Sequence, residues 1–103
     1  MNETDNTHLL SELESNLNKQ LEFARRGNMI SVEETAGQCQ TLVENIKSAG
    51  LMEKPQYQSQ RQHIEKLYQD LLLLLSSQKD AIAGEIKSIA KSKKLLATYR
   101  GNI

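Results

Sequence analysis

Residues of the types that most often perform chemistry are sparse in this chain, which has two histidines, one cysteine and 13 acidic residues. A metal site in a helical protein needs acid and imidazole ligands one helical turn apart, as in a Glu-x-x-His pair. His63 follows Gln60 rather than a glutamate at that spacing, and His8 lies in a polar stretch near the start of the chain. The sequence therefore predicts no metal site.

Cys39 is the only thiol, and a nucleophilic role would require a histidine base that a third group orients. It falls instead on the apolar side of a predicted helix, where a small buried thiol is ordinary. The chain has no glycine-rich phosphate loop, and its acids are predicted to lie on solvent-facing sides of helices. We expect no catalytic residue, no cofactor and no enzyme activity. One cysteine also forms no internal disulfide, which favours a reducing compartment, the cytoplasm.

The most informative residues are five consecutive leucines, Leu71 to Leu75. On a helix they point around the whole circumference, because successive residues are about 100° apart. Leu72 and Leu74 flank the apolar stripe of this helix, whereas Leu73 faces away from it. Two explanations stay open. In the first, a neighbouring helix covers this section, or a single exposed leucine has no role. In the second, the leucines bind a partner helix or a second copy of the chain.

A second candidate surface lies near the C-terminus, where Leu95 and Tyr99 fall off the stripe among lysines. Cations near a helix C-terminus are favourable, so these residues can simply form a solvated face. A partner-binding or autoinhibitory tail is the alternative. Nucleic acid is disfavoured as a partner, because a single tyrosine makes a poor stacking platform. The candidate partner-binding residues are Leu72, Leu73, Leu74, Leu95 and Tyr99.

Helices are expected to position these residues, because apolar side chains recur every three or four positions. The first helix is predicted over residues 7–26, with Gly27 as its stop. The second is predicted over residues 32–49, with Ser31 and Glu34 forming an N-terminal capping box. One long helix is predicted over residues 56–99, because no proline follows Pro55 and the stripe keeps its phase.

The predicted fold class is therefore all-α, with two shorter helices packed on one long C-terminal helix. A break near Ser76–Asp80 would instead give an antiparallel four-helix bundle. Either arrangement is a single helical domain over residues 1–103. Five glycines and one proline are too few for a many-stranded β fold, which needs a turn about every 8–12 residues.

The charges balance to zero but are unevenly distributed along the chain. Residues 1–54 carry nine acids and five bases, and residues 55–103 carry four acids and eight bases. We interpret this asymmetry as attraction between antiparallel helices, and the zero net charge argues against nucleic acid as the main partner. The longest apolar run has five residues, far short of the about 20 that a membrane span needs. The polar, acidic N-terminal stretch is unlike a secretory signal.

Several segments together resemble the small flagellar export chaperones of the FliT type and, more loosely, the FlgN type. Ala24 to Asn28 resembles the Ala-x-x-Gly-Asp/Asn stretch that ends the first helix of that family. Thr41 to Ile46 is similar to the leucine-and-valine segment of its second helix. Ile64 to Lys79 and Lys91 to Tyr99 are similar to its later helical part.

This resemblance implies a cytoplasmic chaperone without enzyme activity or cofactor. Such a protein binds a terminal helix of a flagellar cap or hook-associated protein, prevents premature assembly and delivers its client to the type III export apparatus. The residues alone leave an alternative, a self-associating coiled-coil adaptor in which Leu71 to Leu75 forms the seam of a homodimer.

Overall fold

The computed structural model describes residues 3–78 and 83–101, with side chains described for residues 8–78 and 83–96. All the regular structure in this part of the chain is helical, which confirms the all-α prediction. In chain order the elements are α1 (Glu3–Arg25), α2 (Met29–Ser48), the 3-10 turns η1 (Leu51–Glu53) and η2 (Pro55–Tyr57), α3 (Gln58–Ser76) and α4 (Ala83–Gly101).

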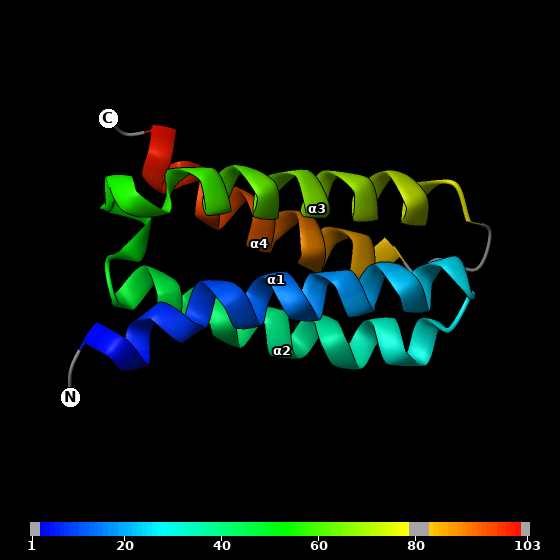
Figure 1. The fold of residues 1–103 in the computed structure, drawn as a ribbon. Coiled ribbons are helices and arrows are strands. Elements are labelled where there is room, and N and C mark those ends of the chain that lie inside the picture. The colour runs from blue at the N-terminus through cyan, green and yellow to red at the C-terminus, as the bar shows by residue number, and fades with distance from the viewer. Residues whose placement is uncertain (1–2, 79–82, 102–103) are drawn as a thin grey trace.

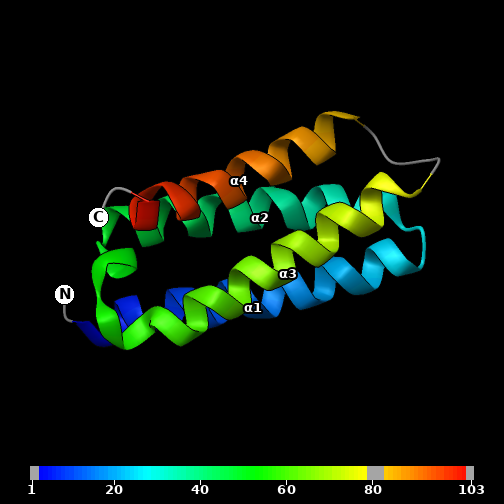
Figure 2. The same ribbon diagram turned by 90° about the horizontal axis from the view of Figure 1, so that it is seen from above.

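The four α-helices lie lengthwise in a molecule that measures 42 × 27 × 20 Å along its principal axes (Figure 1). Helices α1 and α3 run in one direction, and α2 and α4 run in the other. Helix α1 packs on α2 and α3, and α4 packs on the same two helices, so that α2 and α3 are diagonal neighbours. Seen from above, α3 lies along α1 and α4 lies along α2 (Figure 2). The two 3-10 turns therefore carry the chain across the diagonal at one end of the molecule.

The core is formed by apolar residues that recur at the predicted three-and-four spacing. Helix α1 buries its stripe from Leu10 to Ala24, and α3 buries Leu71 and Leu75 at 0% and 1% exposure. The other buried apolar residues are Val32, Ala36, Cys39, Leu42, Val43, Ile46, Leu51, Met52, Ile64, Leu67, Tyr68, Ile89 and Leu96. Each described helix thus turns one side inward, as expected for amphipathic helices around a shared core.

The first helix ends as the sequence predicts, at a glycine in the left-handed conformation. Gly27 has a φ angle of 74°, which side chains with a Cβ rarely adopt. The N–H groups of Gly27 and Asn28 donate to the carbonyl oxygens of Ala24 and Phe23 at 3.0 and 2.9 Å. This double hydrogen bond satisfies two carbonyl groups at the end of α1 and turns the chain sharply.

The predicted start of the second helix at residue 32 is wrong, because Asn28 rather than Ser31 is the N-cap. The Asn28 side chain accepts a hydrogen bond from the Ser31 N–H at 3.2 Å, and α2 begins at Met29. Asparagine caps helices as well as serine does, and here it directly follows the Gly27 turn. Ser31 and Glu34 therefore lie inside the helix. Helix α1 also begins earlier than predicted, at Glu3 rather than residue 7.

The prediction of one long helix over residues 56–99 is also wrong. Helix α3 ends at Ser76, and α4 begins at Ala83 and folds back alongside it. The end of α3 coincides with the alternative break near Ser76–Asp80. Ile89 and Leu96 consequently lie in the same core as the stripe of α3.

Local hydrogen bonds explain why the helix stops at the serines. The Ser77 hydroxyl donates to the Leu74 carbonyl at 2.7 Å, and the backbone N–H groups of Ser77 and Gln78 donate three residues back. Such bonds compete with the i to i−4 pattern of an α-helix. The Gln78 side chain also donates to the Ala24 carbonyl at 2.5 Å, which ties the end of α3 to the end of α1.

An arginine that the sequence analysis did not single out holds the diagonal connection. Arg61 is 6% exposed, and its guanidinium donates to the carbonyl oxygen of Met52 in η1. Leu51 and Met52 are themselves buried. The connection between α2 and α3 is therefore anchored by both apolar packing and a charged hydrogen bond, which is stronger than a neutral one.

The opposite exposures of two nearby leucines generate a stability prediction. We expect Leu71→Ala to lower the free energy of unfolding by about 2–5 kcal/mol, because it leaves a cavity in the core. Leu73→Ala makes the same chemical change at a position that is 65% exposed, and should alter stability by less than about 0.5 kcal/mol. Urea denaturation of both variants measures the difference. Equal losses would mean that the stripe has been assigned to the wrong side of α3.

The corrected N-cap generates a second prediction. Asn28→Ala should lower the free energy of unfolding by about 1 kcal/mol, because it removes the acceptor for the Ser31 N–H. Ser31→Ala should be neutral or slightly stabilising, because alanine favours a helix interior more than serine does. Thermal melting of the two variants distinguishes the caps, and a larger loss from Ser31→Ala would support a start at residue 32.

Candidate partner-binding surface

The predicted surface at the leucine run lies along the last turns of α3. Leu73 is 65% exposed, whereas Leu72 and Leu74 are half-buried and pack against the edge of the core. The helical geometry predicted these directions correctly. The three residues offer an apolar ridge with its crest at Leu73, which we call the α3 ridge. Its role in binding stays a prediction.

The polar groups that adjoin the α3 ridge are balanced in charge. Lys66 and Asp70 form an ion pair at 2.7 Å one to two turns before Leu73, on the outer side of α3. Gln69 and Ser76, the residues four before and three after Leu73, are both exposed. Positions three or four apart on a helix are neighbours, so these side chains border Leu73 directly. A surface of this kind favours apolar packing over recognition of one sign of charge.

The two C-terminal candidates lie elsewhere in the molecule. Leu95 is half-buried against the core, beside the fully buried Leu96. Tyr99 lies in the final turns of α4, and its side chain is outside those that the structure describes. Because α4 runs opposite to α3, this part of α4 lies toward the other end of the molecule from the α3 ridge (Figure 1). The five predicted residues do not form one continuous surface.

Ile30 is an exposed apolar residue that the sequence analysis missed. It is 73% exposed in the first turn of α2, at the end of the molecule where α3 also ends (Figure 1). The prediction started the second helix at residue 32, which left Ile30 in a loop. Recognising Asn28 as the cap would have placed Ile30 on a helix, away from the side that Val32 and Ala36 bury.

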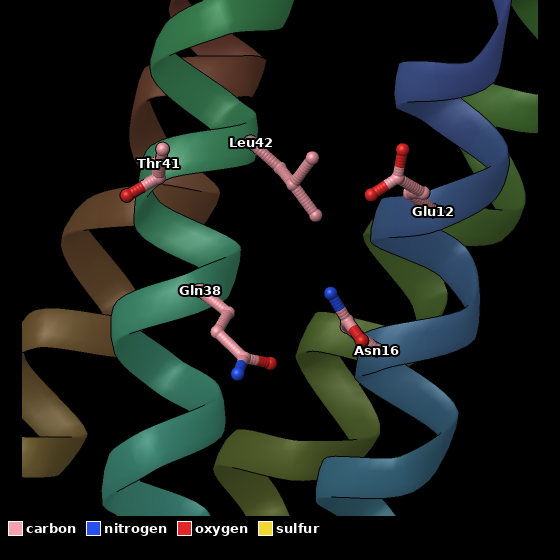
Figure 3. Close-up of a pocket in the computed structure, with 5 residues that line it drawn as sticks. All are labelled: Glu12, Asn16, Gln38, Thr41 and Leu42. Atoms are coloured by element: carbon pink, nitrogen blue, oxygen red, sulfur yellow. The ribbon is translucent and has the colours of Figure 1, made fainter.

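A shallow groove of about 450 Å³ lies between α1 and α2, and five residues line it. Figure 3 shows Gln38 and Leu42 of α2 directed toward Glu12 and Asn16 of α1, whereas Thr41 points away from them. Leu42 is the one apolar residue of the five, and it is only 8% exposed. The groove therefore combines amide and carboxylate groups with one largely buried leucine side chain.

The residues considered for chemistry lie in ordinary structural environments. Burial raises the pKa of Cys39 to about 12, so the thiol stays protonated at neutral pH and is a poor nucleophile. His63 contacts Glu14 across the α1–α3 boundary, and Gln60 donates to the same carboxylate at 3.3 Å. His8 is exposed on α1. Within residues 8–78 and 83–96, no three His, Cys, Asp or Glu side chains cluster closely enough to hold a metal ion.

No protein-family model matches the chain, and neither the curated proteins nor the solved structures yield a match. The resemblance to FliT-type chaperones therefore stays a prediction. In the part of the chain that the structure describes, no helix combines the length and the apolar character required to cross a membrane.

Two carboxyl groups meet where α2 and α4 begin. Burial raises the pKa of Glu85 above its usual value of 4.5, and the neighbouring Glu33 carboxyl adds to the rise by repulsion and by a side-chain hydrogen bond. The protonated form of Glu85 is thus favoured in the folded state. Its contribution to stability is present below pH 4.5 and is lost as the pH rises through the raised pKa.

The carboxyl pair generates a prediction about pH dependence. Glu85→Gln should raise the melting temperature at pH 7.5, where the wild-type carboxyl is charged, and should change it little at pH 4, where that carboxyl is largely protonated. Glu34→Gln, at an exposed position of α2, is the matched control for loss of one negative charge. Melting curves at both pH values test the effect, and the same shift at pH 4 and pH 7.5 would contradict it.

Proposed function

We propose that this protein is a non-enzymatic binding protein that holds an amphipathic helix of another protein against the α3 ridge, as a FliT-type export chaperone does. The observation that carries the proposal is the 65% exposure of Leu73 between two half-buried leucines. A helix of the partner laid along α3 would cover all three side chains at once. Laying an apolar helix face on such a surface is a recurrent mode of recognition.

The energy available from this contact suits a reversible chaperone. Covering one leucine side chain is worth about 1.5–3 kcal/mol, and the flanking leucines add the part of their surface that the core leaves open. The balanced Lys66–Asp70 pair imposes no requirement for a highly charged client. A client helix would therefore be selected by its apolar face, which suits segments that are prone to premature assembly.

The client, the compartment and the destination follow from the family resemblance. In this proposal the client is a terminal helix of a flagellar cap or hook-associated protein, bound in the cytoplasm before type III export. The chaperone needs no cofactor and no catalytic residue, because holding and releasing a helix requires only a change in binding equilibrium. The export apparatus is the proposed acceptor of the complex.

A second candidate function is self-association through the same ridge. The Lys66–Asp70 pair places both signs of charge beside Leu73, so two antiparallel copies of α3 can present matching surfaces to each other. The protein would then be a coiled-coil adaptor whose ridge is occupied by a second copy. The two candidates differ in what covers Leu73.

The substitution Leu73→Asp tests the proposal. The variant should stay folded, because the core of the chain does not use this side chain, and it should bind the client helix tenfold to a hundredfold more weakly. The probe is a synthetic peptide of the terminal helix of a filament cap protein, titrated by calorimetry. Sedimentation velocity measures self-association, and circular dichroism checks the fold.

Ile30→Asp is the matched control, because Ile30 is the other large apolar side chain that is exposed in the described part of the chain. If Leu73→Asp weakens peptide binding and Ile30→Asp does not, the client lies on the α3 ridge. If both variants weaken it equally, the peptide adheres to exposed apolar surface in general. Loss of self-association alone would favour the adaptor, and unchanged binding and association would refute both candidates.

A further inference from the structure

The groove between α1 and α2 is lined by polar side chains that the fold itself does not use. Glu12 is exposed on α1, and no cation among the described residues pairs with its carboxylate. The side-chain amides of Asn16 and Gln38 form no hydrogen bond with any other described residue. One carboxylate and two amides in the same groove can therefore all bind a ligand without breaking a contact within the bundle.

These groups come from both walls of the groove and face the same space (Figure 3). Gln38 points from α2 toward Asn16 of α1, and Leu42 points from α2 toward Glu12. Glu12 and Asn16 are four residues apart on α1, so their side chains are neighbours on one side of that helix. A ligand in this groove of about 450 Å³ meets the carboxylate and both amides together.

The charges in and around the groove favour a cation as the ligand. Glu12 is the one charged side chain among the five residues that line the groove. Of the Asp, Glu, Lys and Arg residues one helical turn from the lining residues, two are acidic, Glu34 and Glu44, and one is basic, Lys19. The local charge is therefore negative, which raises the concentration of cations at this surface.

We propose that the groove binds an arginine side chain of a partner protein. A guanidinium has a permanent positive charge and several N–H donors in one plane, so it can donate to the Glu12 carboxylate and to the amide oxygens of Asn16 and Gln38. Hydrogen bonds between charged groups are stronger than neutral ones. The ammonium of lysine is a compact point charge, which suits acceptors on two opposite walls less well. This site lies on α1 and α2, away from the α3 ridge, and goes beyond the proposed function.

Two matched peptides test the site by NMR titration of the full chain. The first is a short acetylated and amidated alanine peptide with one arginine at its centre. The second has citrulline at that position, which keeps the shape of the side chain and removes its charge. We expect the arginine peptide to shift the side-chain amide signals of Asn16 and Gln38 along a saturable curve. The citrulline peptide should bind about fivefold more weakly, the factor that corresponds to a loss of about 1 kcal/mol.

Glu12→Gln should weaken binding of the arginine peptide by a similar factor, about fivefold, because it removes the charged acceptor. Glu44→Gln is the matched control, since it removes one negative charge at an exposed position of α2 that does not line the groove. It should change the affinity by less than about twofold. Leu73→Asp should bind the arginine peptide as the wild type does, so failure of the α3 ridge as a binding surface would leave this site intact.

Three outcomes would overturn the proposal. Equal affinity for the citrulline peptide would show that the charge of the ligand is not recognised. Equal weakening by Glu12→Gln and Glu44→Gln would show general attraction to an acidic surface rather than a site. Loss of arginine-peptide binding in Leu73→Asp would place the peptide on the α3 ridge instead of in the groove.

Discussion

The apolar stripe of α3 has to be enclosed on two sides, and most of the architecture follows from that requirement. Helix α1 packs on one side of α3 and α4 on the other, while α2 lies diagonally opposite. A straight continuation of α3 would have left half of this stripe in water. The stop at Ser76, with Ser77 and Gln78 bonded back to the ends of α3 and α1, lets α4 return and cover it.

Enclosing α3 in this way divides the leucine run into two kinds of residue. Leu71 and Leu75 fall inside the enclosure, and Leu73 falls outside it because it lies about 180° from the stripe. No neighbouring helix among the described residues covers Leu73, so the chain carries an apolar ridge that its own core does not require. The feature that suggests a function is thus a direct consequence of where the stripe lies.

Spacing in the sequence was enough to predict the helical class, the buried stripes and the direction of Leu73, because each depends on helical periodicity within one segment. The N-cap of α2 was predicted wrongly because asparagine and serine are comparable caps. The choice between Asn28 and Ser31 depended on the position of the Gly27 turn, which Asn28 directly follows. The break after Ser76 depended on a contact with Ala24, distant in sequence, and on burial of Ile89 and Leu96. On one continuous helix Leu95 would also have lain about 33 Å from Leu73, so the separation of these two candidates was predictable from the sequence.

The start and the middle of α4 place different demands on its sequence, which explains its weak amphipathic pattern. Near its start, Glu85 meets the Glu33 carboxyl of α2, and near its middle Ser92 interrupts the apolar seam beside Tyr68. Both features reduce the apolar contact of α4 compared with α1, whose stripe is unbroken from Leu10 to Ala24. Among its described side chains α4 therefore contributes two buried apolar residues to the core, Ile89 and Leu96, whereas α1 contributes five.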